Sequence, residues 1–409
     1  MTDISRRFMI GRRQFLLASG AALAMPYVHR AYAEDEIVIA NLHPVTGFVA
    51  LDGKIATAGC KTAVDEINEA GGIKSLGKKL KLITGDTQGK NDVASVETQR
   101  VIQAGAVGIV GSYLSSTTRI TTQVAEQNKT PHVADEGVAD EIMQRGFKYT
   151  FRIAPSSSNL GLLSAQNMAL LMKSAGLSQM SVAYMHEDSA FGSSVGRTFP
   201  EAAKENGMEV RTVLSYAATS TDLSVETSKL LATGADVIAA STYYGDGLLI
   251  AKLVQQRKPE IKAFVGVGSA AYANPTFPKD MGAGAEGYFN NIMHWNPASP
   301  ELPALLERFA KFSEGLALTH QGAYAYTAVQ VLADAIERAG SADKETIREA
   351  LTKTDLTDHI LPQGPIVFDE TGQNKNAGIV MLQIQNATPT VVLPEQYAQA
   401  KPIFPTKFG

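Results

Sequence analysis

The chain has 409 residues, enough for two domains. Hydrophobic residues make up 44% of it and charged residues 19%, as is usual for a globular protein. The 37 basic and 41 acidic residues give a formal net charge of −4. This near balance, without a basic run in the part expected to fold, argues against nucleic acid as a partner.

The first 33 residues have the pattern of an export signal rather than of a fold. A charged start with Arg12-Arg13 is followed by an apolar run to Met25 and by Ala31-Tyr32-Ala33. The sequence around Arg12-Arg13 resembles the twin-arginine export signal. The apolar run is too short to span a bilayer comfortably. We therefore expect cleavage after Ala33 and an exported mature chain.

Neither cysteine nor histidine points to a metal or a cofactor. Cys60 is the only cysteine, so the chain forms no intramolecular disulfide, and the residue is far from the cleavage site and cannot carry a lipid anchor there. The seven histidines show none of the spacings typical of metal ligands. No later apolar run is long enough for a membrane helix. The sequence thus predicts a freely soluble protein without a metal or cofactor.

In the first part of the mature chain, short apolar runs alternate with helical patterns. We expect strands at residues 37–41, 80–83, 106–110 and 131–134, and helices at 54–70, 91–103, from 115 to 127 and at 138–144. This alternation is typical of βαβ units, and it predicts a parallel sheet with helices on both faces.

Near residue 151 the pattern starts again and predicts a second lobe of similar size. Strands are expected at 180–185, 208–214, 235–240, 263–267 and 287–294, and helices at 159–174, 193–205, 223–232, 247–256, 303–314 and 321–339. The tail from residue 361 becomes extended. The predicted fold class is α/β, with two doubly wound parallel-sheet lobes. A cleft between two such lobes is where small ligands bind.

Residues 106–122 suggest a binding site for an anion. An apolar strand ends in Gly111-Ser112, and a Ser/Thr cluster then begins a helix. A helix start has unpaired backbone N–H groups and the positive end of the helix dipole. The hydroxyls of Ser115, Ser116, Thr117 and Thr118 add to these donors, so a carboxylate would be favoured. A capped helix without a ligand would show the same residues.

Aromatic residues follow several predicted strands. In an α/β sheet the carboxyl ends of the strands are where ligands lie, so these rings suggest a wall facing the cleft. They are Phe48, Tyr113, Phe191, Tyr243, Tyr244 and Trp295.

Two motifs of enzymes occur without the context they require. Gly192, Ser194 and Gly196 match the G-x-S-x-G pattern of hydrolases, but that serine must stand directly after a strand. Gly266 and Gly268 fit part of a dinucleotide-binding pattern, but a Pro-rich stretch soon interrupts the helix this pattern needs. We therefore do not predict an enzyme.

The order of several segments resembles the leucine/isoleucine/valine-binding family of periplasmic solute-binding proteins, which serve ABC importers and have the type I fold. The segments are Thr46-Gly47, residues 111–118, residues 144–149, Phe151-Arg152, Phe191-Gly192, Tyr243-Tyr244 and residues 285–287. The resemblance covers nearly the whole mature chain and, with the export signal, implies a periplasmic receptor.

The resemblance also implies an arrangement of lobes and site residues. Three crossovers join a first lobe of residues 34–154 plus 290–358 to a second lobe of residues 155–289 plus 359–409. Ser115 matches the residue that holds a ligand carboxylate, and Gly137 and Val138 match positions whose backbone faces the ligand. Phe48, Phe191 and Tyr243 match the aromatic wall. The expected partners are a small molecule and a membrane permease, and we expect a monomer.

One departure from the family bears on the ligand. Where the family's amino-acid binders place an acidic residue after the strand at 263–267, this chain has Gly268 and Ser269, and Phe48 and Phe191 stand where tyrosine is frequent. A buried ammonium without a partner is costly, so the sequence favours an apolar or aromatic acid without an amino group.

An amino acid stays the alternative, because another acid could hold its ammonium. The candidates are Asp135, Glu136, Glu187 and Asp246. Two other classes use related features. An amide or urea sensor shares the fold, but the export signal argues against a cytosolic regulator. A hydrolase built on Ser194 would need histidine and acid partners.

Overall fold

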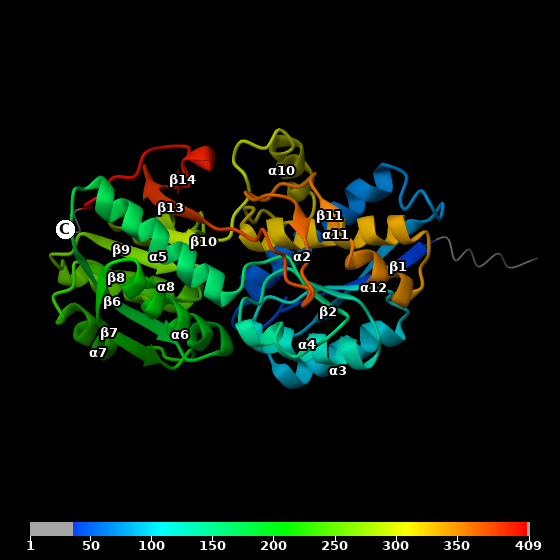
Figure 1. The fold of residues 1–409 in the computed structure, drawn as a ribbon, viewed down its shortest axis with the longest axis horizontal. Coiled ribbons are helices and arrows are strands. Elements are labelled where there is room, and N and C mark those ends of the chain that lie inside the picture. Colours follow the sequence, from blue (N-terminus) through cyan, green and yellow to red (C-terminus); the bar gives the residue numbers. More distant parts are fainter. Residues whose placement is uncertain (1–35, 407–409) are drawn as a thin grey trace, which may run out of the picture. The chain divides into compact units, whose positions relative to one another are not determined.

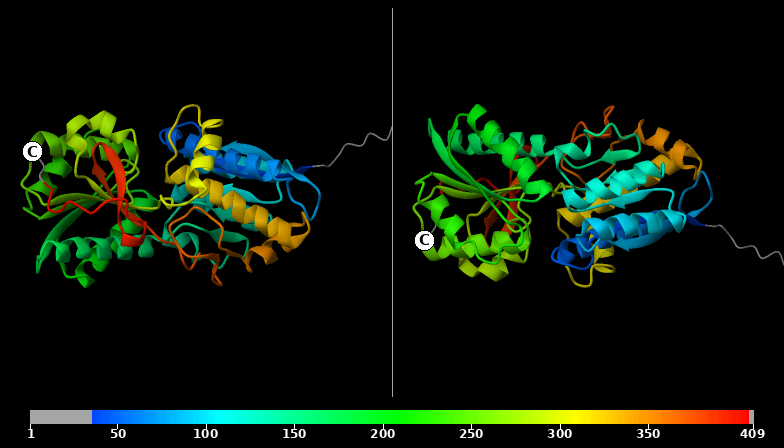
Figure 2. Two further views of the ribbon diagram at one scale, coloured as in Figure 1. Left: turned by 90° about the horizontal axis from the view of Figure 1, so that it is seen from above. Right: turned by 90° about the horizontal axis from the view of Figure 1, so that it is seen from below.

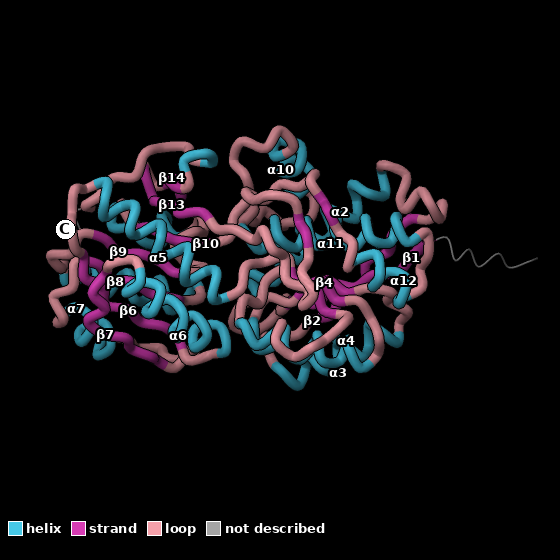
Figure 3. Tube along the Cα trace, viewed as in Figure 1, coloured by secondary structure: helices cyan, strands magenta, loops and turns pink. Residues whose placement is uncertain are grey.

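Two separate β-sheets organise residues 36–406, the part of the chain that the computed structural model describes. Glu36–Gly409 form one unit. In this unit the strands form an inner layer with helices outside them (Figures 1 and 3). We call the five-stranded sheet with its helices the first lobe and the seven-stranded sheet with its helices the second lobe. The expected export signal over residues 1–33 lies outside the described residues.

The first sheet is parallel throughout, in the order β2-β1-β3-β4-β5. Its strands are β1 (Glu36–His43), β2 (Lys79–Asp86), β3 (Ile109–Gly111), β4 (His132–Ala134) and β5 (Thr150–Arg152). The helices of this lobe are α2 (Ala50–Glu69), α3 (Asn91–Gln103), α4 (Ser115–Gln127), η1 (Asp140–Ile142), α10 (Leu302–Ala310), α11 (His320–Ala339) and α12 (Lys344–Leu351).

Burial along β1 explains why helices cover both faces of the first sheet. Ile37 and Ile39 pack into the core that includes α2 and α11. Ala40 and Leu42 pack into a second core with residues of α3 and α4. A strand that is apolar on both faces requires a cover on each side. The pair α2 and α11 supplies one cover and the pair α3 and α4 the other (Figure 1).

The second sheet has the order β14-β13-β10-β9-β8-β6-β7. Its strands are β6 (Met180–Glu187), β7 (Met208–Tyr216), β8 (Val237–Ser241), β9 (Ala263–Val267), β10 (Phe289–Ile292), β13 (Val380–Gln385) and β14 (Thr388–Leu393). Its helices are α5 (Ser157–Ser174), α6 (Ala190–Glu205), α7 (Ser224–Leu231), α8 (Tyr244–Arg257), α9 (Phe277–Met281), η2 (Gly282–Ala285) and η3 (Glu395–Tyr397). Within this sheet the described pairs β10–β13 and β13–β14 are antiparallel, and the other pairs are parallel.

Segments distant in the sequence complete each lobe (Figure 2). Helix α11 packs on α2, and the hairpin of β13 and β14 extends the second sheet beyond β10. The chain therefore crosses between the sheets three times: after β5, after β10, and between β12 (Ile366–Val367) and β13.

Two of the expected lobe boundaries are wrong. Residues 290–292 belong to β10, which pairs with β9 and β13 in the second sheet. At the other boundary, β12 pairs with β11 (Asp355–Leu356), and the Arg152 N–H donates to the Gly372 carbonyl over 2.8 Å. The crossing into the second lobe thus comes after these contacts and not at residue 359, because backbone pairing holds this segment beside β5.

Most expected elements are present, and the errors are local. The helix at 91–103 and the strand at 263–267 have the expected bounds. Strand β3 begins at Ile109 rather than at residue 106, although the Val107 N–H already donates to the Val38 carbonyl over 2.9 Å. Helix α12 is not expected from the sequence, because it has only eight residues with three buried side chains.

None of the helices within residues 36–406 is both long and apolar enough to cross a membrane.

The contact between α2 and α11 depends on a glycine. A Cβ atom added to Gly59 would lie 2.1 Å from the carbonyl oxygen of Gly322. We expect Gly59→Ala to force the helices apart and to lower the free energy of unfolding by about 2–4 kcal/mol. Urea unfolding followed by circular dichroism measures this loss.

Gly245→Ala is the matched control, because a Cβ there meets open space in helix α8. We expect it to change the free energy of unfolding by less than about 0.5 kcal/mol. Equal stability of the two variants would show that the helix contact tolerates the methyl group.

Candidate functional site

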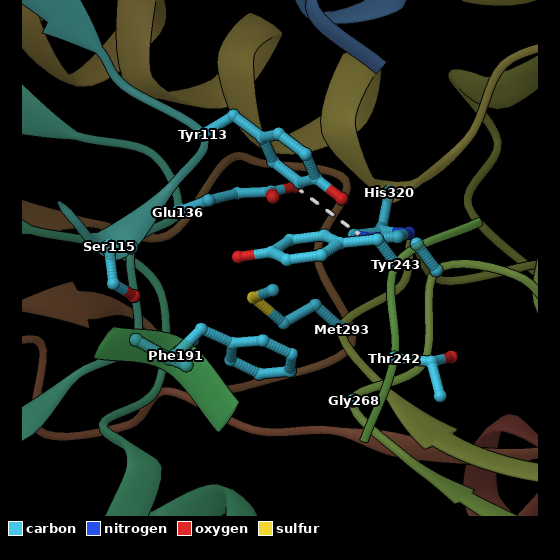
Figure 4. Close-up of a pocket in the computed structure, with 12 residues that line it drawn as sticks. Tyr113, Ser115, Glu136, Phe191, Thr242, Tyr243, Gly268, Met293 and His320 are labelled. Carbon is cyan, nitrogen blue, oxygen red and sulfur yellow. Dashed lines mark ion pairs between the residues drawn. The ribbon is translucent and has the colours of Figure 1, made fainter. Parts of the chain in front are cut away.

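A pocket of about 40 Å³ lies where residues of the two lobes meet, and Figure 4 shows its lining. The first lobe and its loops contribute Tyr113, Ser115, Glu136, Gly137, Val138 and His320. The second lobe contributes Phe191, Thr242, Tyr243, Gly268 and Ala270, and Met293 directly follows β10. Most of these residues follow the carboxyl ends of strands, which is where an α/β sheet binds ligands.

Ser115 is the first residue of α4 and faces the pocket. The first backbone bond of this helix runs from the Thr118 N–H to the Leu114 carbonyl over 2.8 Å, so the N–H groups of residues 115–117 precede the helical pattern. The Ser115 Oγ accepts a hydrogen bond from the Ala139 N–H over 3.2 Å. This bond leaves the hydroxyl proton of Ser115 for a ligand oxygen.

The two neighbouring hydroxyls lie elsewhere. The Thr117 hydroxyl donates to the Leu114 carbonyl over 3.0 Å and is buried. Neither Thr117 nor Ser116 lines the pocket. The prediction that four hydroxyls face one ligand is therefore wrong for Ser116, Thr117 and Thr118, because successive helix residues point in different directions.

Gly137 and Val138 line the pocket, as the resemblance implies. Their carbonyl groups already accept hydrogen bonds, from the Arg152 guanidinium over 2.8 Å and from the Ser157 N–H over 2.7 Å. Gly137 has a φ of +68°, and a Cβ there would lie 2.5 Å from the Thr118 Oγ1. The position thus requires glycine.

Three of the predicted aromatic residues meet in the pocket. The ring of Tyr243 lies between Tyr113 and Phe191, with ring centroids 6.1 and 5.7 Å away (Figure 4). Phe48 also contacts Tyr243, at 6.0 Å, but it is 66% exposed and does not line the inner pocket. The prediction that Phe48 belongs to the aromatic wall of the ligand site is therefore wrong for the inner pocket. Phe48 lies with Tyr243 in the lining of a second, outer pocket.

Tyr243 separates the inner pocket from an outer one of about 470 Å³. Phe48, Tyr244 and two acidic residues, Asp52 and Asp246, line the outer pocket. Burial raises the pKa of each of these two carboxyl groups to about 7. Tyr243 is thus a lining residue of both pockets.

The acids that the sequence offered as partners for an ammonium have different surroundings. Asp135 accepts hydrogen bonds from His43 and from the Glu136 N–H, and Glu187 accepts from Ser189 and Gly192. Asp246 lines the outer pocket and accepts from the Tyr216 hydroxyl. Of the four, Glu136 is the one that lines the inner pocket.

Sequence reasoning did not find Thr242, Ala270, Met293 and His320 as lining residues. His320 begins α11, which is far from the other site residues in the chain and reaches the pocket by packing on α2. The signal for Met293 was its place at the end of the strand expected at 287–294, because β10 in fact ends at Ile292.

The serine of the G-x-S-x-G pattern is not a nucleophile. Ser194 lies inside α6, is fully buried, and shares a hydrogen bond of 2.6 Å with the Ser157 hydroxyl. A nucleophile elbow needs an exposed serine on a strand-to-helix turn. Among the described residues, no three of the histidine, cysteine, aspartate and glutamate side chains come together as a metal site.

The sequence matches the profile of the family described as "Periplasmic binding protein" over residues 36–389. The chain belongs to the periplasmic binding protein family. It is 28% identical over 404 residues to the "Leu/Ile/Val-binding protein homolog 8" of Brucella suis, an alignment that covers 94% of this chain and 98% of that protein. The resemblance to the leucine/isoleucine/valine-binding proteins is thereby confirmed.

Solved structures of two other proteins share the fold of this periplasmic binding protein. The branched-chain amino acid transporter substrate binding protein LivJ of Streptococcus pneumoniae, in complex with isoleucine, has a TM-score of 0.75 at 21% identity, covering 90% of this chain and 100% of that one. A solute binding protein of an ABC transporter from Rhodopseudomonas palustris, in complex with 3,4-dihydroxy benzoic acid, has a TM-score of 0.75 at 19% identity, covering 87% and 95%. The type I fold is confirmed.

The raised pKa of Asp52 makes stability depend on pH. Burial holds this pKa at about 7, and its Oδ1 accepts a bond of 3.0 Å from the Gln321 side chain. A carboxyl group with a raised pKa in the folded state stabilises the protein at low pH, and this contribution is lost as the pH rises toward 7. Asp52→Asn has no carboxyl group to ionise at this position. On going from pH 5 to pH 8, we therefore expect the free energy of unfolding of this variant to rise by about 1–3 kcal/mol relative to that of the wild type.

Urea unfolding at both pH values measures this difference. Asp92→Asn, at an exposed aspartate in the first turn of α3, is the control and should follow the wild type at both. Parallel pH profiles for the wild type and Asp52→Asn would contradict the expectation.

Proposed function

We propose that this protein is the exported substrate-binding component of an ABC importer and that it binds a small carboxylate in the inner pocket. It acts as a receptor without enzymatic activity, works as a monomer, and delivers its ligand to a membrane permease. The three chain crossings form the hinge, about which the lobes open for the ligand and close on it.

The observation that carries the proposal is that a carboxylate site and an apolar site converge in one pocket. The Ser115 hydroxyl and the N–H groups at the start of α4 are donors suited to a carboxylate. Phe191, Tyr243 and Met293 face them and are suited to an apolar or aromatic body. Closure between such walls excludes water and strengthens the polar contacts.

The two related structures support the same ligand chemistry. One holds isoleucine and the other 3,4-dihydroxy benzoic acid, and both of these molecules carry a carboxylate next to an apolar body. They differ in the amino group. The residues of this pocket therefore have to decide whether its own ligand carries one.

Glu136 changes the argument about that amino group. The sequence favours an acid without an amine because Gly268 stands where a carboxylate partner is expected. Since Glu136 lines the pocket, an ammonium has a possible partner on the other lobe. The position of Gly268 is thus no longer a reason to reject an amine.

The ligand is found by measuring thermal shifts of the mature chain with a panel of carboxylic acids and amino acids, and by mass spectrometry of any small molecule that copurifies. We expect Ser115→Ala to weaken binding of the identified ligand by about 10- to 100-fold, because a hydrogen bond to a charged group contributes about 1.5–3 kcal/mol. Isothermal titration calorimetry measures the affinity.

Ser116→Ala is the matched control, since Ser116 stands in the same helical turn and does not line the pocket. It should bind with the affinity of the wild type. The proposal fails if Ser115→Ala and Ser116→Ala both bind as the wild type does, or if no carboxylate in the panel or the copurified material binds.

A further inference from the structure

Glu136 is a buried acid with an unsatisfied oxygen in the proposed ligand pocket. It is 3% exposed, and its Oε1 takes part in no hydrogen bond with any residue the structure describes. Its side chain extends along the pocket wall toward Tyr113 and His320 (Figure 4). A buried polar atom without a partner is costly, so its place in a binding pocket points to a donor that arrives with the ligand.

The neighbours of Glu136 do not supply that donor as a cation. The His320 Nε2 lies 3.7 Å from the Glu136 Oε1, beyond hydrogen-bond distance. Burial lowers the pKa of His320 to about 3, so this ring is neutral near pH 7, and burial raises the pKa of Glu136 well above its usual range. The other titratable groups that face Glu136 from its own loop, α2, the loop before α4 and α11 are Asp135, Asp52, Tyr113 and Tyr324.

The charge of the pocket distinguishes two kinds of ligand. The described residues that line it include no lysine or arginine. A ligand that carries only a carboxylate brings no cationic donor for the Glu136 Oε1. A ligand with both a carboxylate and a protonated amine brings an ammonium, which offers this buried oxygen the donor that it lacks.

We propose that Glu136 is the specificity-determining residue of this pocket and that it accepts the protonated amine of the ligand. This inference rests on the proposed function, in which Ser115 holds the carboxylate of the same molecule. Both polar contacts then belong to the first lobe, while Phe191, Tyr243 and Met293 cover the apolar body. The second-lobe position after β9, where Gly268 has a φ of +74°, leaves room for the ring of Phe191 in place of an acid.

The amine also gives binding a proton signature. Burial raises the pKa of the Glu136 carboxyl group, and an ammonium that pairs with it lowers this pKa, because an opposite charge favours the ionised form. Binding of an amine-bearing ligand therefore favours proton release from Glu136, and binding of an amine-free acid does not.

The test uses matched triplets of one carbon skeleton: leucine with 2-hydroxy-4-methylpentanoate and 4-methylpentanoate, and phenylalanine with 3-phenyllactate and 3-phenylpropionate. Calorimetry in phosphate and in Tris buffer at pH 7 gives affinity and proton release for the wild type and for Glu136→Gln. We expect the amine to bind at least tenfold more tightly than its amine-free partners, with proton release. Glu136→Gln should lose this preference and the proton release together.

Two further variants separate the possible results. Glu141→Gln, in the nearby helix η1 and outside the pocket, should behave as the wild type, and Ser115→Ala should weaken all members of a triplet alike. If the hydroxy or amine-free acids bind as tightly as the amine, or if Glu136→Gln keeps the preference, the inference is wrong while the proposed function stands. If no amino acid of the triplets or of the panel binds while an amine-free carboxylate does, the inference is wrong and the proposed function stands, and if no carboxylate binds at all, both fail.

Discussion

The binding pocket depends on one constraint: the carboxyl ends of the strands of both lobes, with the loops that follow them, are buried at the same place. Parallel strands direct their connecting loops to one edge of the sheet, and here the edges of both lobes contribute to one pocket. Polar groups such as Ser115 and Glu136 are therefore removed from water where they stand at loop ends. In such surroundings a hydrogen bond is strong and an unpaired group is costly, so the pocket selects a ligand by what it satisfies.

This burial also sets the charge of the acidic groups. Asp52, Asp246 and Glu136 all have a raised pKa, with burial as the first cause in each case. The carboxyl groups of Asp135 and Glu187 already accept hydrogen bonds from neighbouring residues, so they are parts of the scaffold. Asp52 and Asp246 also accept hydrogen bonds, from Gln321 and Tyr216, whereas Glu136 lines the inner pocket with an oxygen that has no partner among the described residues.

The same reasoning explains why enzyme-like motifs in this chain are not active sites. The Ser194 hydroxyl is bonded to Ser157 inside the second lobe, and Gly266 belongs to strand β9, where a Cβ would meet the side chain of Asn290 at 2.2 Å. Both motifs thus serve packing. Tyr243, by contrast, lines both pockets and contacts the rings of Phe48, Tyr113 and Phe191.

The sequence by itself determined the α/β class, most elements and the position of Ser115 at the start of a helix, because these follow from local periodicity and residue preferences, and the family came from the resemblance of several segments along the chain. Tertiary structure decided the rest. Ser116 and Thr117 do not line the inner pocket, because their side chains point away from it on the first turn of α4. Phe48 lines the outer pocket instead of the inner one. His320 begins α11, a helix late in the chain, and lines the pocket only because α11 packs on α2. Which acid remains unpaired depends on contacts between residues far apart in the sequence, and no local pattern records them.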